Sequence, residues 1–283
     1  MTLKSPIGVF DSGYGGLTVL KELRSLLPQY DYLYLGDNAR APYGSHSFQL
    51  IYQYTKEGVE YLFSQGCPLV ILACNTASAR ALRQLQMCDL PKSQDPTRRI
   101  LGVIRPTVEY LGTLSASEPM EAGLVATSAT IASNSYGIEM SKYAPNIRLT
   151  QKATPLWAAL VEQGEIDDNA GVNYFIQRDL SQLLAQTPNM QTLVLACTHY
   201  PMLLPRIEQA LQKEIKIITQ GSIVAHSLSD YLVRHTEMEC RLTKGHSVSY
   251  CTTEADHRFA KMADFFMPGT VTTEVVTHVS LAR

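Results

Sequence analysis

The sequence predicts an α/β protein built from two similar halves, each a parallel sheet with helices on both faces. Three observations support this prediction. Short apolar segments alternate along the chain with stretches that have helical spacing. The apolar segments are almost continuously hydrophobic, which is typical of strands covered by helices on both faces. Finally, an apolar run followed by a cysteine occurs twice, in LVILACNTASA (69–79) and in TLVLACTHYPMLL (192–204).

The composition is that of a folded globular protein. The chain has 283 residues, of which 45% are hydrophobic and 18% charged, enough for one large domain or two ordinary ones. A net charge of −2 gives no reason to expect a nucleic-acid partner. The apolar runs are much shorter than the ~18 residues that span a bilayer, and the first residues do not resemble a signal peptide. We therefore expect a cytoplasmic protein without membrane contacts.

The first half is predicted to alternate three strands with three helices. The second helix ends at Gly66, a suitable C-terminal cap. A polar, proline-containing stretch at 91–99 then indicates a hinge or a domain boundary. The expected strands are 7–10, 32–36 and 69–73, and the expected helices are 16–27, 48–66 and 76–86.

The second half restarts the alternation after the polar break. Pro201 suits the first turn of the helix that follows the second cysteine segment. The tail carries a helix at 223–235 and strand-like runs at 247–253 and 270–279. The expected strands of this half are 100–104, 123–127, 192–196 and 215–219.

The spacing of the strand ends suggests a duplicated unit. Asp11 ends the first strand and precedes Cys74 by 63 residues, while Thr127 precedes Cys197 by 70. Two such units related by a pseudo-two-fold axis would bring their strand ends face to face. Because open α/β sheets bind ligands at the carboxyl ends of their strands, we expect a cleft lined by Asp11, Cys74 and Cys197.

A cysteine at the start of a helix has a defined chemistry. Unpaired backbone N–H groups and the helix dipole lower the pKa of a thiol and bind a carboxylate. Asn75, Thr76 and Thr198 add short polar groups, so a small dicarboxylate or an amino acid would fit. A single cysteine after an apolar strand is usually a packing residue, but two in matched contexts favour function. The remaining cysteines, Cys67, Cys88, Cys240 and Cys251, are interpreted as structural.

Three other patterns allow alternatives. The glycine-rich turn at 9–20, with Asp37 further on, resembles a dinucleotide site, but it has Thr18 in place of the third glycine, and the charge of Asp11 would oppose a pyrophosphate. The loop DNARAPYG (37–44) is either a ligand contact or a plain surface turn. A metal site is not expected, because the spacings of the remaining candidates fit no structural zinc pattern. These candidates are His235, Cys240, His246, Cys251 and His257.

Four motifs together resemble the signatures of bacterial glutamate racemases, members of the cofactor-independent aspartate/glutamate racemase superfamily. They are DSGYGG (11–16), DNARAPYG (37–44), ACNTASA (73–79) and ACTHYP (196–201). The resemblance covers nearly the whole chain in order and spacing. It implies two α/β domains, the first formed by 1–97 and 219–283 and the second by 98–218. It also implies a homodimer that supplies D-glutamate for peptidoglycan.

The resemblance further implies two cysteines that act as acid and base on opposite faces of the glutamate Cα, without pyridoxal phosphate or another cofactor. Cys74 matches the base for D-glutamate and Cys197 the base for L-glutamate. Asp11 and His199 match supporting groups, and Glu162 matches an acid near His199. From the residues alone, His199 could equally start a helix and Glu162 could be a solvated helix end. The positions that match substrate-binding residues are Ser12, Pro42, Tyr43, Gly44, Asn75, Thr76, Thr127, Thr130 and Thr198.

Two segments depart from the family pattern. Arg105-Pro106-Thr107 stands where Glu-Pro-Gly is common, and Thr219-Gln220-Gly221 stands where an Asp-Ser-Gly-like turn is common. These departures concern regulation, domain motion and the dimer more than the chemistry. Two other functions stay open at this point. One is a related racemase or enzyme acting on aspartate, a malonate-like acid or a hydantoin, and the other is a binding module with an inactive cleft.

Overall fold

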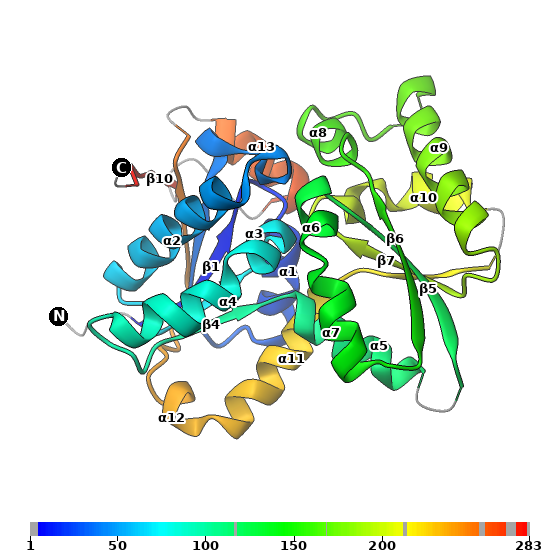
Figure 1. The fold of residues 1–283 in the computed structure, drawn as a ribbon. Helices are drawn as coiled ribbons and strands as arrows, with labels where there is room; N and C mark the ends of the chain where they lie inside the picture. Colours follow the sequence, from blue (N-terminus) through cyan, green and yellow to red (C-terminus); the bar gives the residue numbers. More distant parts are fainter. Residues whose placement is uncertain are drawn as a thin grey trace.

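The computed structural model describes residues 5–115, 118–167, 169–211, 214–254, 258–269 and 276–281. Within them the chain forms two parallel sheets that lie side by side (Figure 1). The first sheet has the strand order β10-β9-β2-β1-β3-β4 and the second β6-β5-β7-β8. The strands of the first sheet are β1 Ile7–Asp11, β2 Tyr32–Gly36, β3 Leu69–Leu72, β4 Arg99–Gly102, β9 Val248–Thr252 and β10 Val276–His278; those of the second are β5 Met120–Ala126, β6 Ile147–Ala153, β7 Thr192–Ala196 and β8 Lys216–Ile218.

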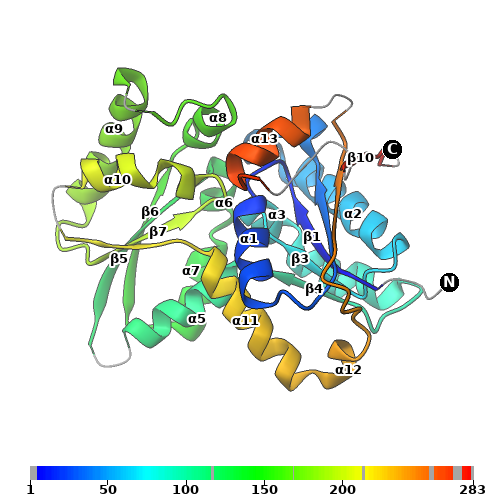
Figure 2. The same ribbon diagram turned by 180° about the vertical axis from the view of Figure 1, so that it is seen from behind.

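Helices cover both faces of each sheet, as predicted. Figure 1 shows α2 in front of the first sheet, and Figure 2 shows α1 on its other face. The helices of the first part of the chain are α1 Leu17–Leu26, α2 Phe48–Ser64, α3 Asn75–Arg80, α4 Leu82–Gln84, α5 Ile104–Leu114, α6 Ser128–Ser133 and α7 Ser135–Tyr143. Those that follow are α8 Trp157–Glu162, α9 Ala170–Gln186, α10 Leu204–Ala210, α11 Gly221–Arg234, α12 Thr236–Glu239 and α13 Arg258–Phe266. Among the described residues, we find no helix with the length and apolar character needed to cross a bilayer.

Alternating side chains of the strands build a separate core on each face. In the second sheet, Val125 and Leu195 pack with α9 and α10, while their neighbours Leu124 and Val194 pack with α5 and α7. Such strands are buried on both faces and therefore read as continuous apolar runs. The three-layer arrangement predicted from the apolar runs is confirmed.

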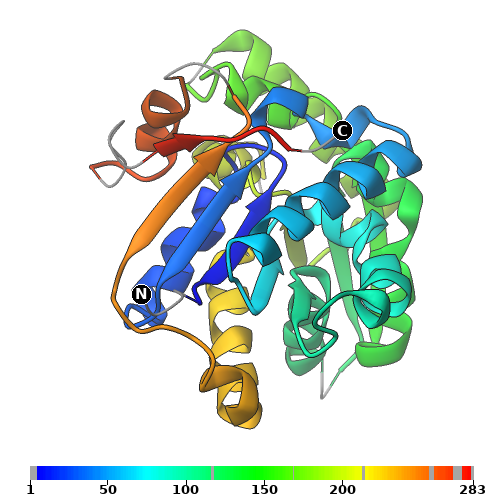
Figure 3. The ribbon, with the colours of Figure 1, turned by 90° about the vertical axis from the view of Figure 1, so that its left-hand side faces the viewer.

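The two sheets repeat one topology. The strands β2-β1-β3-β4 of the first sheet and β6-β5-β7-β8 of the second have the same order relative to the chain. Strands β9 and β10 extend the first sheet beyond this shared unit, and Figure 3 shows β9 (orange) alongside the blue strands. The two halves meet at a pair of helices. Helix α3, which follows β3 in the first half, contacts α6, which follows β5 in the second. The prediction of two similar halves is confirmed.

Two strands differ from the prediction. The strand expected at 100–104 was assigned to the second half, but β4 pairs with β3, with Leu69 opposite Arg99, in the first sheet. The polar break before it is a surface connection that returns the chain to the same sheet. Strand β6 was not predicted, because it lies at the edge of its sheet and its sequence, IRLTQKA, mixes polar with apolar side chains. Of the run expected at 270–279, residues 270–275 lie outside the described residues.

Candidate active site

The two cysteines of the repeated motif lie at equivalent places in the two halves. Cys74 follows β3 and is the N-cap residue of α3, where its Sγ accepts a hydrogen bond from the backbone N–H of Ala77 at 3.4 Å. Cys197 directly follows β7. Their relative exposures are only 5% and 7%. The end of β1 joins the two segments, since Ser12 Oγ lies 3.4 Å from Cys74 Sγ and the adjacent Asp11 accepts a hydrogen bond from Thr198, the residue after Cys197.

The surroundings of Cys74 disfavour its thiolate. Burial raises the pKa of Cys74 to about 12, and the charge of Asp11 adds to this rise. The Ser12 hydroxyl, with its Oγ 3.4 Å from Sγ, and the Ala77 N–H act in the opposite direction. The expectation that the pKa of this thiol is lowered at the helix start is therefore wrong. Desolvation outweighs the helix N-terminus.

Cys197 stands at the end of a chain of polar contacts. Its Sγ lies 3.8 Å from Nδ1 of His199, and Nε2 of His199 lies 3.0 Å from Oε1 of Glu162, at the end of α8. The second contact is an ion pair when His199 is protonated. Burial works against a charge on His199, but the contacts with Cys197 and Glu162 outweigh it and raise the pKa of His199 well above its ordinary value. Glu162 is thus a paired side chain rather than a solvated helix end.

Asp11 links the two halves. It ends β1, is fully buried, and accepts hydrogen bonds from the Gly13 N–H at 2.9 Å and from Thr198 Oγ1 at 3.3 Å. Burial raises the pKa of Asp11, while the charge of His199 and the hydrogen bonds from Gly13, Gly16 and Thr198 oppose the rise. The Asp11 carboxyl group is therefore a buried acid that contacts the Cys197 segment through Thr198.

The glycine-rich turn is shaped by the opposite half of the molecule. A Cβ atom on Gly15 would collide with Thr198 Oγ1 and would lie 2.6 Å from Nδ1 of His199, and one on Gly13 would lie 3.2 Å from Oε1 of Glu162. The turn needs glycine so that the backbone can approach the Cys197 segment closely. Because side chains of the second half fill the space beside the turn, the dinucleotide interpretation is not supported.

Three threonine hydroxyls form a second contact between the halves. Thr76 Oγ1 on α3 lies 2.9 Å from Thr127 Oγ1 and 3.3 Å from Thr130 Oγ1, and the latter two are 2.9 Å apart. Thr127 also caps α6 by accepting from the Thr130 N–H. Gly44 lies against the same threonine, since a Cβ there would be 2.8 Å from Thr127 Cβ. The loop at 42–44 therefore contacts the site instead of forming a plain surface turn.

Comparison with known proteins identifies the family. The chain matches none of the models in a scan of protein families. It is 38% identical over 269 residues to the glutamate racemase of Paracoccus denitrificans (strain Pd 1222), which covers 92% of this chain and 96% of that protein. It is 36% identical over 276 residues to the glutamate racemase of Ruegeria sp. (strain TM1040), with 95% and 98% covered. The chain belongs to the glutamate racemase family.

Solved structures of the family share the fold over nearly the whole chain. The glutamate racemase of Francisella tularensis in complex with D-glutamate superposes with a TM-score of 0.84 at 31% identity, covering 98% of both chains. A glutamate racemase isoform of Bacillus anthracis gives a TM-score of 0.85 at 30% identity, covering 99% of this chain and 98% of that one. An aspartate racemase of Picrophilus torridus, at 18% identity and a TM-score of 0.54, shares the fold alone.

Asp37 anchors the loop that follows β2, a role that the sequence did not reveal. Its Oδ2 accepts from the Tyr43 hydroxyl and, at 2.7 Å, from Arg40 Nε, while its Oδ1 accepts from Thr253 Oγ1 at 2.8 Å. The buried carboxylate thereby anchors the loop that carries Pro42, Tyr43 and Gly44. The available signal was an acidic residue at a strand end with arginine three positions later. From the sequence, Asp37 was interpreted as a possible ribose ligand and as the first residue of the loop DNARAPYG (37–44).

The remaining predicted residues are placed as follows. The side chain of Asn75 does not point to solvent, but is hydrogen-bonded to Gln220 and Tyr136 in the core. Gln220 and Tyr136 were not predicted, because nothing in their own segments marks them. Of the rejected metal candidates, Cys251 is buried beside the Tyr61 hydroxyl at 3.6 Å, and His257 lies outside the described residues.

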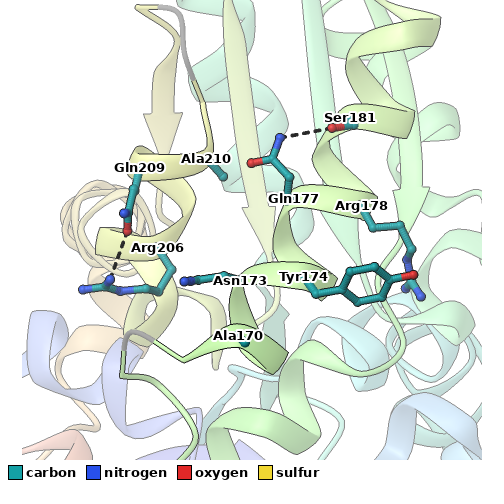
Figure 4. Close-up of a pocket in the computed structure, with 9 residues that line it drawn as sticks. All are labelled: Ala170, Asn173, Tyr174, Gln177, Arg178, Ser181, Arg206, Gln209 and Ala210. Atoms are coloured by element: carbon teal, nitrogen blue, oxygen red, sulfur yellow. Dashed lines mark hydrogen bonds between the residues drawn. The ribbon is translucent and has the colours of Figure 1, made fainter.

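A large pocket of the molecule lies elsewhere. It is a hollow of about 660 Å³ between α9 and α10 (Figure 4). Its walls include Tyr174 and Arg206, and hydrogen bonds from Gln177 to Ser181 and from Arg206 to Gln209 brace it. It contains none of the predicted site residues. The two buried thiols, rather than this surface hollow, mark the site that the family resemblance points to.

Proposed function

We propose that this enzyme interconverts L- and D-glutamate with two cysteines as acid and base, without a cofactor. The observation that carries this proposal is the pair of buried thiols at equivalent strand ends of two repeated halves. One thiolate removes the Cα proton and the other thiol delivers a proton to the opposite face. The curated relatives and the Francisella structure with D-glutamate support glutamate as the substrate.

The two thiols have different helpers in this proposal. Cys74 acts with Ser12 and Asp11, and Cys197 acts with His199, which Glu162 holds. A protonated His199 stabilises a negative charge on Cys197 and can return its proton. We assign Cys74 to D-glutamate and Cys197 to L-glutamate by the match of their motifs to the family.

The site needs hydrogen-bond donors that hold the carboxylates of the substrate. Fixed donors of this kind also stabilise the negative charge that develops when the Cα proton is removed. In this proposal the donors are the backbone N–H groups that open α3, the hydroxyls of the threonine cluster and the amide of Asn75. The Thr198 hydroxyl donates to Asp11 and would bind the substrate by exchanging this partner. The loop at 42–44 closes one side of this space. Since both thiols are nearly sealed from solvent, glutamate must enter through a relative movement of the two halves.

The wider biological role follows from the family and is part of the same proposal. We propose that the enzyme supplies D-glutamate for peptidoglycan in the cytoplasm and works as a homodimer. We also propose that the chain forms two domains, one around each sheet, and that β4 belongs to the first domain. Analytical ultracentrifugation of the purified chain tests the dimer, which should sediment at twice the 31.4 kDa chain mass.

The activity is tested by proton exchange. In heavy water, without added cofactor, L-glutamate should lose its Cα proton signal in NMR spectra and D-glutamate should form. Aspartate in the same assay tests the alternative of a related racemase. Faster exchange of aspartate would overturn glutamate as the substrate, and no exchange of either amino acid would support a binding module instead.

A further inference from the structure

The side-chain amide of Gln220 is buried at a point where several helices begin. Gln220 lies between β8 and α11 and is 4% exposed. Its hydrogen-bond partners are Asn75 at the start of α3, Thr107 in α5 and Tyr136 in α7, with a longer contact of 3.5 Å from Nε2 to the Val103 carbonyl. A buried amide that bonds to three separate helices fixes their relative positions, because each lost partner would leave a polar group unsatisfied.

The contact with Thr107 in α5 decides which end of the Gln220 amide is the nitrogen. The Thr107 hydroxyl donates to the backbone carbonyl of Val103 at 2.7 Å, so its oxygen accepts from Gln220 Nε2 at 2.8 Å. This turns the nitrogen of Gln220 toward α5 and its Oε1 toward α3. Asn75 must then present its own nitrogen, and Nδ2 donates to Gln220 Oε1 at 2.6 Å.

Tyr136 closes a ring of three side chains. Gln220 Nε2 also donates to the Tyr136 hydroxyl at 2.8 Å, and that hydroxyl donates to Asn75 Oδ1 at 2.6 Å. A flipped Asn75 amide would set its Oδ1 against Gln220 Oε1, which is also an acceptor, and would take from the Tyr136 hydroxyl its acceptor. The ring thus holds one orientation of Asn75. Within the described part of the chain, only one of the two Nδ2 hydrogens has a partner, which leaves the other for a ligand.

We propose that Gln220 is a positioning residue for the racemisation and acts through Asn75. This inference rests on the proposed function, in which Asn75 binds glutamate beside Cys74. Asn75 directly follows Cys74 and opens α3, so the ring fixes the amide next to the thiol. Thr107 and Tyr136 belong to helices that pack on the second sheet. The ring therefore also ties the Cys74 side of the site to the opposite half.

A double-mutant cycle tests this role. Gln220→Met keeps the length of an unbranched side chain but removes its hydrogen-bonding groups. We expect it to lower kcat/KM about tenfold, mainly through KM, as for the loss of one hydrogen bond to the substrate-binding group. When Asn75→Ala is already present, adding Gln220→Met should change kcat/KM by less than about threefold, because the route of its effect is gone.

A matched control is Gln86→Met. Gln86, an exposed residue, also donates an amide hydrogen bond, from Nε2 to the Ile100 carbonyl of β4 at 2.7 Å, and this bond involves none of the ring residues. It should leave kcat/KM unchanged. If Gln220→Met has no effect, or if its effect multiplies with that of Asn75→Ala, the positioning role is wrong.

A second variant guards against a folding defect. Tyr136→Phe removes only the hydroxyl that closes the ring and should cause a smaller loss, about threefold, that Asn75→Ala also masks. If the losses of kcat/KM caused by Tyr136→Phe and Asn75→Ala multiply in the double variant, the positioning role of Gln220 is also wrong. The unsubstituted chain is measured in the same assay. If it does not racemise glutamate, the proposed function fails, whereas an active parent with independent variants overturns only the role of Gln220.

Discussion

The two thiol regions have the same place in the fold but opposite electrostatics. Cys74 and Cys197 follow equivalent strands of two sheets with one topology. Around Cys74 lie a carboxyl group and a neutral hydroxyl, and burial raises its pKa to about 12. Beside Cys197 lies a histidine whose pKa is raised by the thiol and by Glu162 against the effect of burial. A duplicated backbone thus supplies the geometry, and unlike side chains supply two chemical roles.

The largest expected effect comes from removing either thiol. Cys74→Ala and Cys197→Ala should each lower kcat/KM by at least about 10³-fold, since each removes a positioned acid or base. Enantiomers have equal free energy in water, so each variant must lose activity equally in both directions. Steady-state rates from L- and D-glutamate measure this. Cys88→Ala, which changes an exposed cysteine, is the control. Near-parental turnover by either site variant would contradict the two-base mechanism.

A smaller effect is expected at the helpers of Cys197. Glu162→Gln removes the charge that raises the pKa of His199, so kcat/KM should fall by about 10- to 100-fold, as for the loss of a charged contact. The pH-rate limb that belongs to His199 should move to lower pH. Glu165→Gln, an exposed residue three positions on, should have no effect on either quantity. If the pH profile of Glu162→Gln is not shifted, Glu162 does not support His199 beside Cys197.

The smallest effect concerns stability at alkaline pH. The pKa of Cys74 is raised from 9.0 to about 12 by folding, so its neutral form is favoured. The resulting stabilisation is complete below pH 9 and is lost as the pH rises toward 12. Other buried thiols and tyrosines contribute in the same window, so the comparison is made with Cys74→Ser. Between pH 8 and 10, the parent should lose about 1 kcal/mol more unfolding free energy than this variant, as urea titrations would show. If the parent and Cys74→Ser lose the same unfolding free energy, the environment of Cys74 is more polar than the structure indicates.

The sequence predicted those features that follow from local pattern. Asp11, Cys74 and Cys197 were found because they end apolar strands at matched spacings, and parallel strands collect such ends at one edge. Strand β6 was missed because an edge strand has no continuous apolar run. Strand β4 was assigned to the wrong half because a polar break marks a surface loop as readily as a domain boundary.

Other features depend on distant contacts that no local pattern contains. Thr107 and Gln220 lie in two segments that depart from the family pattern at separate places in the sequence, yet their side chains are hydrogen-bonded to each other. The hydrogen bond from Thr253 to Asp37, which helps to anchor the loop at 42–44, joins residues that are also far apart along the chain. The pKa of Cys74 was predicted in the wrong direction because the depth of its burial cannot be read from a helix start.

The assignment of one thiol to each enantiomer is tested most directly by Cα proton exchange in the single variants. In heavy water, Cys74→Ala retains the base proposed for L-glutamate and should exchange the Cα proton of L-glutamate faster than that of D-glutamate. Cys197→Ala should show the reverse preference. Equal exchange of both enantiomers by either variant, or the same preference in both variants, would contradict the division of labour between Cys74 and Cys197.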